Sequence, residues 1–373
     1  MEKSSFAITV LLIFYCIFSL VIPAKCYRHY PHPSKYETPN SLFIFGDSLF
    51  DAGNNNYINT LSQANYYPYG GTFFKFPSGR FCDGRTIPDF IAEYAKLPLI
   101  PPYLFPGNHN FKYGVNFASS GSGALIETRK GTVIDLKTQL SYFKNVSIQL
   151  KQQMGYADAK TLLSRAVFLF SVGSNDYSFP FETNSTVLIS HTTEEFVGMV
   201  IGNITEVIEE IYKFGGRKFG FLSLGQLGCS PSGRVLERGN NGACFEGFTP
   251  FVKSHNTQLS MRLKKLETKR KGFKYSLVDF YSLAEERINN PLKYGFKEAK
   301  VACCGSGPYR GHPSCGGRRG EKEYELCENV TDYIFFDFTH PTEKVNQQFA
   351  KEAWSGKPGF SGTYNLKALF ESM

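Results

Sequence analysis

The sequence predicts an α/β protein built on a central parallel sheet of about five strands. Short apolar segments, typical of strands buried on both faces, alternate along the chain with segments that have helical periodicity. Crossover connections of this kind place successive strands parallel in one sheet, with helices covering both faces. With 373 residues, of which 42% are hydrophobic, the chain is long enough to bury a sizeable core.

The strands are predicted from short apolar runs that end at glycine or small polar residues. Five such runs lie at 42–45, 113–118, 165–172, 218–224 and 275–280. Another short run, 333–336, leads into Asp337 and is also interpreted as a strand. Because parallel strands share one carboxyl-terminal edge, residues that follow them are expected to meet there.

Helices are predicted between these strands. They cover 86–97, 136–154, 192–214, 248–266 and, as the final helix, 342–354. The clearest of them begins with a possible capping box, Thr192 with Glu195, and stops at Gly215-Gly216. Three segments are interpreted as loops: residues 52–81, the proline-rich 98–110, and the glycine- and cysteine-rich 301–327.

The first residues predict export from the cell. An apolar run from Phe6 to Ile22 follows Lys3 and ends in Pro-Ala-Lys-Cys, which is typical of a secretory signal peptide. A signal anchor is the alternative, but no polar stalk or second apolar segment supports it. We therefore expect residues 1–26 to be removed, and residues 27–373 to form one secreted, extracellular domain without a stable membrane span.

Two further features agree with an extracellular location. Asn-X-Ser/Thr acceptors for glycosylation occur at Asn145, Asn184, Asn203 and Asn329. The remaining cysteines are expected to form disulfides in an oxidising compartment.

The preferred pair is Cys229 with Cys244, whereas Cys82 is expected to be a free buried thiol or to pair with Cys26. The alternative of zinc bound by cysteines in 303–327 and His312 lacks a Cys-X-X-Cys spacing, so neither a metal nor another cofactor is predicted.

The charge distribution argues against a nucleic-acid partner. The formal net charge is +8, but Lys and Arg are scattered along the chain and accompany no nucleic-acid-binding motif.

Residues suited to ester hydrolysis follow several of the predicted strands. Ser48 comes after the first strand, and a serine hydroxyl becomes a good nucleophile when a base takes its proton. His340 is the candidate base, and Asp337, three residues earlier, can orient its imidazole. The backbone N–H groups of Ser48 and Gly121 and the side-chain amide of Asn175 are candidate donors to an oxyanion.

Four sequence blocks identify a resemblance that extends over the whole mature chain. They read FGDSLFDAGNN at 45–55, GVNFASSGSG at 114–123, GSNDY at 173–177 and FDFTHPT at 336–342. With these blocks the chain resembles the plant GDSL esterase/lipase family within the SGNH hydrolase superfamily. Two departures, Phe336 where the family often has Trp and LGQLGC at 224–229 in place of a more proline-rich version, touch no catalytic position.

The resemblance implies a flavodoxin-like, three-layer α/β/α fold and hydrolysis of acyl esters through Ser48, His340 and Asp337. It also implies an oxyanion hole formed by Ser48, Gly121 and Asn175. The Gly-X-Ser-X-Gly elbow of α/β-hydrolases is absent from the chain, which argues against that other fold.

The predicted function is that of a secreted, glycosylated, metal-independent serine esterase or lipase that acts on small-molecule or lipid esters through an acyl-enzyme on Ser48. Aromatic residues in the 56–81 loop are interpreted as walls of an acyl pocket, with ordinary loop packing as the alternative. Two other functions remain open: an extracellular acyltransferase that uses the same site, and a catalytically silent lipid-binding protein.

Overall fold

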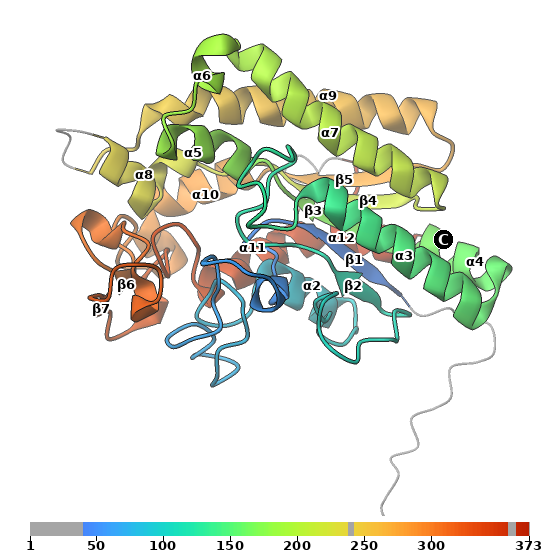
Figure 1. The fold of residues 1–373 in the computed structure, drawn as a ribbon, viewed down its shortest axis with the longest axis horizontal. Helices are drawn as coiled ribbons and strands as arrows, with labels where there is room; N and C mark the ends of the chain where they lie inside the picture. Colours follow the sequence, from blue (N-terminus) through green and yellow to red (C-terminus); the bar gives the residue numbers. More distant parts are fainter. Residues whose placement is uncertain (1–39, 238–241, 357–362, 373) are drawn as a thin grey trace, which may run out of the picture. The chain divides into compact units, whose positions relative to one another are not determined.

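The computed structural model describes residues 40–237, 242–356 and 363–372. The predicted signal peptide, residues 1–26, lies outside them. The central sheet contains five parallel strands in the order β2-β1-β3-β4-β5 (Figure 1). These strands are β1 (Leu42–Gly46), β2 (Gly114–Asn116), β3 (Val167–Ser171), β4 (Lys218–Leu222) and β5 (Lys274–Val278). The predicted α/β class with a parallel sheet of five strands is thus confirmed.

Phenylalanine side chains form one face of the sheet. The register pairs Phe43 with Phe168 and Phe45 with Phe170, so equivalent side chains of neighbouring strands lie beside one another. The Phe43 and Phe168 rings stack with centroids 5.3 Å apart, and the Phe45 and Phe170 rings with centroids 4.9 Å apart. The same two rows continue onto β4. Such aromatic cross-strand pairs fix the register of β1, and therefore the position of the residues that follow it.

Helices cover both faces of the sheet (Figure 1). The helices are α2 (Ile87–Tyr94), α3 (Leu136–Met154), α4 (Tyr156–Arg165), α5 (Ser174–Glu182), α6 (Val187–Ser190), α7 (Thr193–Lys213), α8 (Pro231–Leu236), α9 (Thr249–Lys269), α10 (Phe280–Asn289), α11 (Glu343–Ser355) and α12 (Leu366–Glu371). Helices α3, α4, α7 and α9 share a buried cluster with the phenylalanine face, and α2, α10, α11 and α12 pack on the face that carries Leu42 and Ile44. The architecture has three layers.

The segment 333–336 is not a strand, so that prediction was wrong. Its backbone turns, with the Phe336 N–H donating to the His340 carbonyl at 2.7 Å. The Phe335 and Phe336 carbonyls accept hydrogen bonds from Cys303 and Cys304 at 2.9 and 2.7 Å. This backbone therefore pairs with the cysteine-rich segment instead of the central sheet.

Several predicted boundaries also differ from the structure; the second strand, for example, covers 114–116 instead of 113–118. The last strand ends at Val278, because Asp279 accepts a hydrogen bond from the Ser282 N–H and caps α10. The helix predicted as final, α11, is followed by α12, whose cap is Asn365. By contrast, the predicted capping box of Thr192 with Glu195 is present at the start of α7.

Three disulfides stabilise the carboxyl-terminal half of the chain. The predicted Cys229–Cys244 pair is confirmed, and two further bonds join Cys303 to Cys327 and Cys304 to Cys315. The last two lie around a short antiparallel pair of strands, β6 (Cys304–Gly305) and β7 (Glu325–Leu326). These two disulfides use the sulfur atoms of all four cysteines that the zinc alternative requires as ligands. Cys82 is a buried free thiol, which agrees with the first of the two predictions for it. Cys26, its alternative partner, lies outside the described residues.

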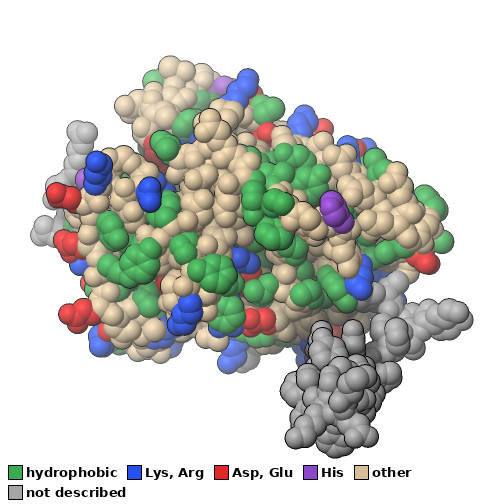
Figure 2. All heavy atoms as spheres, turned by 60° about the horizontal axis from the view of Figure 1, so that its bottom comes forward, with side chains coloured by type: hydrophobic (Ala, Val, Ile, Leu, Met, Phe, Trp, Pro, Cys, Tyr) green, Lys and Arg blue, Asp and Glu red, His purple; other side chains and the backbone are tan. Residues whose placement is uncertain are grey.

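The four predicted glycosylation acceptors are all at least partly exposed to solvent. Asn145, Asn184 and Asn329 are exposed and Asn203 is partly buried on α7. On the face drawn in Figure 2, Lys and Arg side chains are interspersed with Asp and Glu side chains. Among the described residues, no helix is both long and apolar enough to span a membrane.

Candidate active site

The structure brings Ser48, His340 and Asp337 into one hydrogen-bonded chain. The Ser48 Oγ lies 2.7 Å from His340 Nε2, although 292 positions separate the two residues. His340 Nδ1 lies 2.7 Å from Asp337 Oδ1 and 2.9 Å from Oδ2. Because a carboxylate only accepts, Nδ1 carries the proton and Nε2 is left free to accept the serine proton. This arrangement is suited to removing a proton from the serine hydroxyl.

Asp337 is held as a carboxylate inside the protein. It is completely buried, and burial alone would raise its pKa. The charge and hydrogen bonds of His340, together with the Arg319 guanidinium, outweigh burial and lower the pKa of Asp337 to about 2. Its Oδ1 also accepts the backbone N–H groups of Thr339 and His340 at 3.1 and 2.9 Å. The turn found in place of the predicted 333–336 strand thus orients Asp337 and His340.

The predicted oxyanion donors line the same cavity as Ser48 and His340. Among the described residues, no acceptor is bonded to the backbone N–H of Ser48 or of Gly121, so both remain available to a ligand. The Asn175 amide donates to the Ser122 carbonyl at 3.0 Å, which leaves its second N–H. Gly121 has φ +83°, and a Cβ there would lie 3.0 Å from the Arg129 side chain. Glycine is therefore required at 121.

Buried polar side chains connect the strand ends that carry these residues. Gln139, on α3, accepts from the Gly46 N–H and donates to the Gly46 carbonyl, both at 2.9 Å. Asp47 accepts from the Leu49 N–H at 3.1 Å and from the Ser174 hydroxyl at 2.8 Å. Asp47 therefore shapes the turn and also joins the end of β1 to the start of α5.

Asp176 makes a similar connection between α5 and the 121–128 segment. Its carboxylate accepts from the Ala124 and Leu125 N–H groups at 2.8 and 3.0 Å, and from the Thr128 hydroxyl at 2.6 Å. Burial raises the pKa of Asp176 to about 6. Neither Asp176 nor Gln139 was among the residues predicted for the site. The one sequence signal that Asp176 belongs to the site was its position beside Asn175, and no signal marked Gln139.

The cavity beside Ser48 has a volume of about 560 Å³ and mainly apolar walls. One part of its lining comes from a single face of α10, which presents Phe280, Ala284 and Ile288, and another from Val345 and Phe349 on α11. Of the loop predicted to supply aromatic walls, only one aromatic residue, Phe81, lines the cavity, together with Leu61 and Ser62. That interpretation was largely wrong, because most of the lining comes from other segments of the chain, both helices and loops. A cavity of this size and character suits an apolar ligand of small-molecule size.

Known proteins resemble the chain over most of its length. Residues 42–353 match the protein-family model described as GDSL-like Lipase/Acylhydrolase. The chain is 55% identical over 337 residues to "GDSL esterase/lipase 2" of Arabidopsis thaliana, covering 89% of this chain and 90% of that relative. Identity, length and coverage are the same for "GDSL esterase/lipase 1" of that plant. A "GDSL lipase" of Tanacetum cinerariifolium is 48% identical over 333 residues, covering 89% of this chain and 88% of that relative.

Proposed function

The chain belongs to the GDSL-like lipase/acylhydrolase family and is a carboxylic ester hydrolase, and on this basis we propose that it cleaves acyl esters through an acyl-enzyme on Ser48. The observation that carries the proposal is the continuous hydrogen-bonded chain from Ser48 Oγ through His340 to Asp337. It lies at the wall of the apolar cavity, where an ester carbonyl can reach the serine.

The reaction has two steps. Ser48 Oγ attacks the ester carbonyl while His340 Nε2 takes the serine proton, and His340 then gives that proton to the departing alcohol. Water, activated by the same imidazole, attacks the acyl-enzyme and releases the acid. In both steps negative charge develops on the former carbonyl oxygen, and the N–H groups of Ser48, Gly121 and Asn175 stabilise it. The Asp337 carboxylate stabilises the imidazolium formed in each step.

The substrate class follows from the cavity. Its apolar lining along α10 and α11 favours an acyl chain over a charged group. We propose lipid or other acyl esters as substrates. Hydrolysis of a series of p-nitrophenyl esters of increasing acyl length tests this, and failure of the purified protein to hydrolyse any member would contradict the proposed function.

The proposal extends to the site of action. Three disulfides support maturation in an oxidising compartment. We propose that residues 1–26 direct secretion, that residues 27–373 act as one domain outside the cell, and that glycans are attached at the four acceptor asparagines.

Substitution of Asn175, the side-chain donor, tests the proposed oxyanion hole. Asn175→Ala is expected to lower kcat about 100- to 1000-fold, the usual cost of removing one such donor. KM should change little, because the donor interacts most strongly with the charge formed in the transition state. Steady-state kinetics on a short p-nitrophenyl ester measure both constants. The matched control is Asn289→Ala, an exposed residue that does not line the cavity. Equal kcat values for the two variants would exclude Asn175 from the oxyanion hole.

A further inference from the structure

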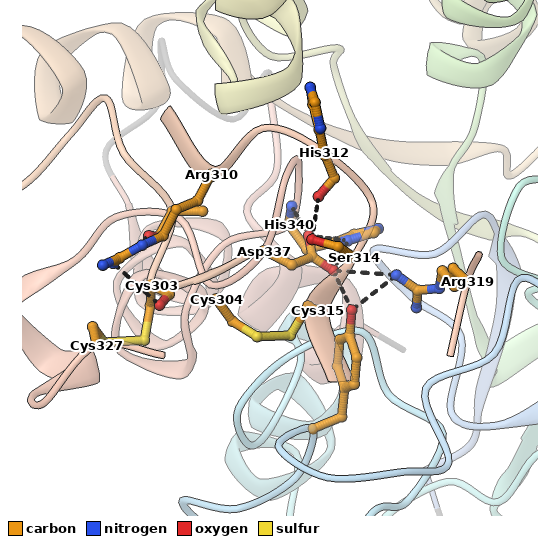
Figure 3. Close-up of a disulfide and its surroundings, with 12 residues drawn as sticks. Cys303, Cys304, Arg310, His312, Ser314, Cys315, Arg319, Cys327, Asp337 and His340 are labelled. Carbon is orange, nitrogen blue, oxygen red and sulfur yellow. Dashed lines mark hydrogen bonds and ion pairs between the residues drawn. A yellow bond between two sulfur atoms is a disulfide. The ribbon is translucent and has the colours of Figure 1, made fainter. Parts of the chain in front are cut away.

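A buried tyrosine and an arginine with a largely buried side chain lie beside Asp337, in addition to His340. Tyr69 is completely buried, and its hydroxyl donates to Asp337 Oδ2 at 2.7 Å. Arg319 Nη1 in turn donates to the Tyr69 hydroxyl at 2.9 Å and lies 4.0 Å from Asp337 Oδ2. Figure 3 shows the Arg319 guanidinium directed toward Asp337. The hydrogen-bonded chain that starts at Ser48 therefore continues past Asp337 to a cation.

Arg319 is itself held in place. Its Nη2 donates to the Gln63 carbonyl at 2.6 Å, and its guanidinium carbon lies 5.2 Å from the Tyr69 ring centroid and 5.0 Å from the Phe81 ring centroid. Phe81 also packs against His340, with ring centroids 5.0 Å apart. One cluster of aromatic rings thus contacts both the arginine and the histidine.

A disulfide fixes the segment that carries Arg319. Cys315 belongs to the short turn η6 (Cys315–Gly317) and is bonded to Cys304. The Cys304 N–H donates to the Phe336 carbonyl, directly before Asp337. Figure 3 shows this disulfide beside the Arg319–Asp337 contact. The segment of Arg319 and the turn of Asp337 are therefore linked through Cys304.

We propose that Tyr69 and Arg319 are positioning residues that set the orientation of the Asp337 carboxylate, and through it the aim of His340 at Ser48. The inference rests on the proposed function and assigns a task to two residues that take no part in its proton transfers; Arg319 also lines the cavity, whereas Tyr69 does not.

The division of hydrogen bonds at Asp337 supports this role. Oδ1 accepts two backbone N–H groups, whereas Oδ2 accepts the Tyr69 hydroxyl, and the His340 Nδ1–H lies within reach of both oxygens. Without Tyr69, Oδ2 loses the tyrosine hydroxyl, and the rotation of the carboxylate about its bond to Cβ is then restrained only by the two backbone N–H groups on Oδ1 and by His340 itself. Hydrogen bonds that hold the Asp337 carboxylate in place also hold the His340 imidazole bonded to it in one orientation.

Charge supports the same conclusion. Asp337 is buried, and an uncompensated buried carboxylate is costly. The Arg319 guanidinium is one of the groups that lower the pKa of Asp337, so it keeps the carboxylate charged and able to accept from His340. Tyr69 does not line the cavity, so it has no contact through which to bind the acyl chain.

The test compares Tyr69→Phe with Tyr66→Phe. Tyr69→Phe removes a hydrogen bond to a charged group and is expected to lower kcat about tenfold or more, with KM within about twofold of the wild type. Tyr66 is the matched control, because its ring packs beside Tyr69, with centroids 5.5 Å apart, while its hydroxyl makes no hydrogen bond to Asp337. We expect Tyr66→Phe to keep both constants.

A second readout follows the His340–Asp337 hydrogen bond directly. The proton between Nδ1 and the carboxylate should give a strongly downfield signal in a one-dimensional proton spectrum at low temperature. Tyr69→Phe is expected to shift or broaden this signal, and Tyr66→Phe to leave it in place. A merely structural role for Tyr69 would lower the melting temperature without moving the signal in the folded protein.

If Tyr69→Phe does not fold, Arg319→Lys supplies the test, since it keeps the charge but loses the second hydrogen bond of the guanidinium. It is expected to lower kcat below that of the wild type and to shift the same signal. An unchanged kcat and an unchanged downfield signal in the folded variant would overturn the inference. Failure of the proposed function looks different: the wild type itself would not hydrolyse any ester.

Discussion

Replacing Ser48 by Ala is expected to lower kcat about a millionfold and to leave the fold intact. The hydroxyl is the proposed nucleophile, and without it no acyl-enzyme can form. Ser48 is partly exposed, and among the described residues the side-chain partner of its hydroxyl is His340, so the substitution removes one side-chain hydrogen bond, at the wall of the cavity. Hydrolysis of a short p-nitrophenyl ester measures the loss, and thermal unfolding checks the fold.

The control for this substitution is Ser178→Ala. Ser178 lies on α5 and lines the same cavity, but it is not bonded to His340. It should keep turnover within about twofold, because an exposed or partly exposed substitution away from the reacting groups has little effect. Turnover retained by Ser48→Ala would refute the assignment of the nucleophile.

His340→Ala is expected to have an effect of similar size, about a millionfold in kcat. The serine then keeps its proton, and no group delivers a proton to the leaving alcohol. The double variant with Ser48→Ala should be no slower than either single variant, because the two side chains act as one unit. Steady-state kinetics on the three variants measure this non-additivity.

The control is His312→Ala, a partly exposed histidine in the cysteine-rich segment that does not line the cavity. It is expected to retain normal turnover. Additive losses in the double variant would contradict the proposal that His340 acts on Ser48, because independent groups contribute independently.

The sequence predicts the sheet and the site residues for related physical reasons. Buried parallel strands are continuous apolar runs, and these runs are recognisable without coordinates, as Leu42 to Phe45 illustrates. Residues that follow such strands, here Ser48, Gly121 and Asn175, must meet at one edge of the sheet. His340 and Asp337 were placed at the same edge from the wrong premise, since 333–336 is a turn and not a strand.

The supporting residues were beyond prediction from the sequence alone. Tyr69 lies 268 positions from Asp337, and Arg319 lies 250 positions from Tyr69. Both belong to loops, where no periodicity marks a buried side chain. Gln139 is similar, because a polar residue on an amphipathic helix gives no sign that its amide bonds a distant strand end. Most aromatic residues of the 56–81 loop do not form pocket walls, because Tyr69 packs against Asp337 and others, such as Tyr67 and Phe76, are exposed.

The disulfide pairing could likewise be predicted only in part. Cys229 and Cys244 close a local loop, and proximity along the chain was sufficient to favour them. The other two bonds join adjacent cysteines, Cys303 and Cys304, to different partners. Adjacent side chains of extended backbone point to opposite sides, so only the three-dimensional path of the loop decides which partner each one meets.

Covalent labelling with a fluorophosphonate ester tests the central claim most directly. Such probes react with a serine only when a neighbouring base activates it. The wild-type protein should carry the adduct on the peptide that contains Ser48, and His340→Ala should label far more slowly. An enzyme that hydrolyses esters but carries the adduct on another residue, or on none, would contradict the account.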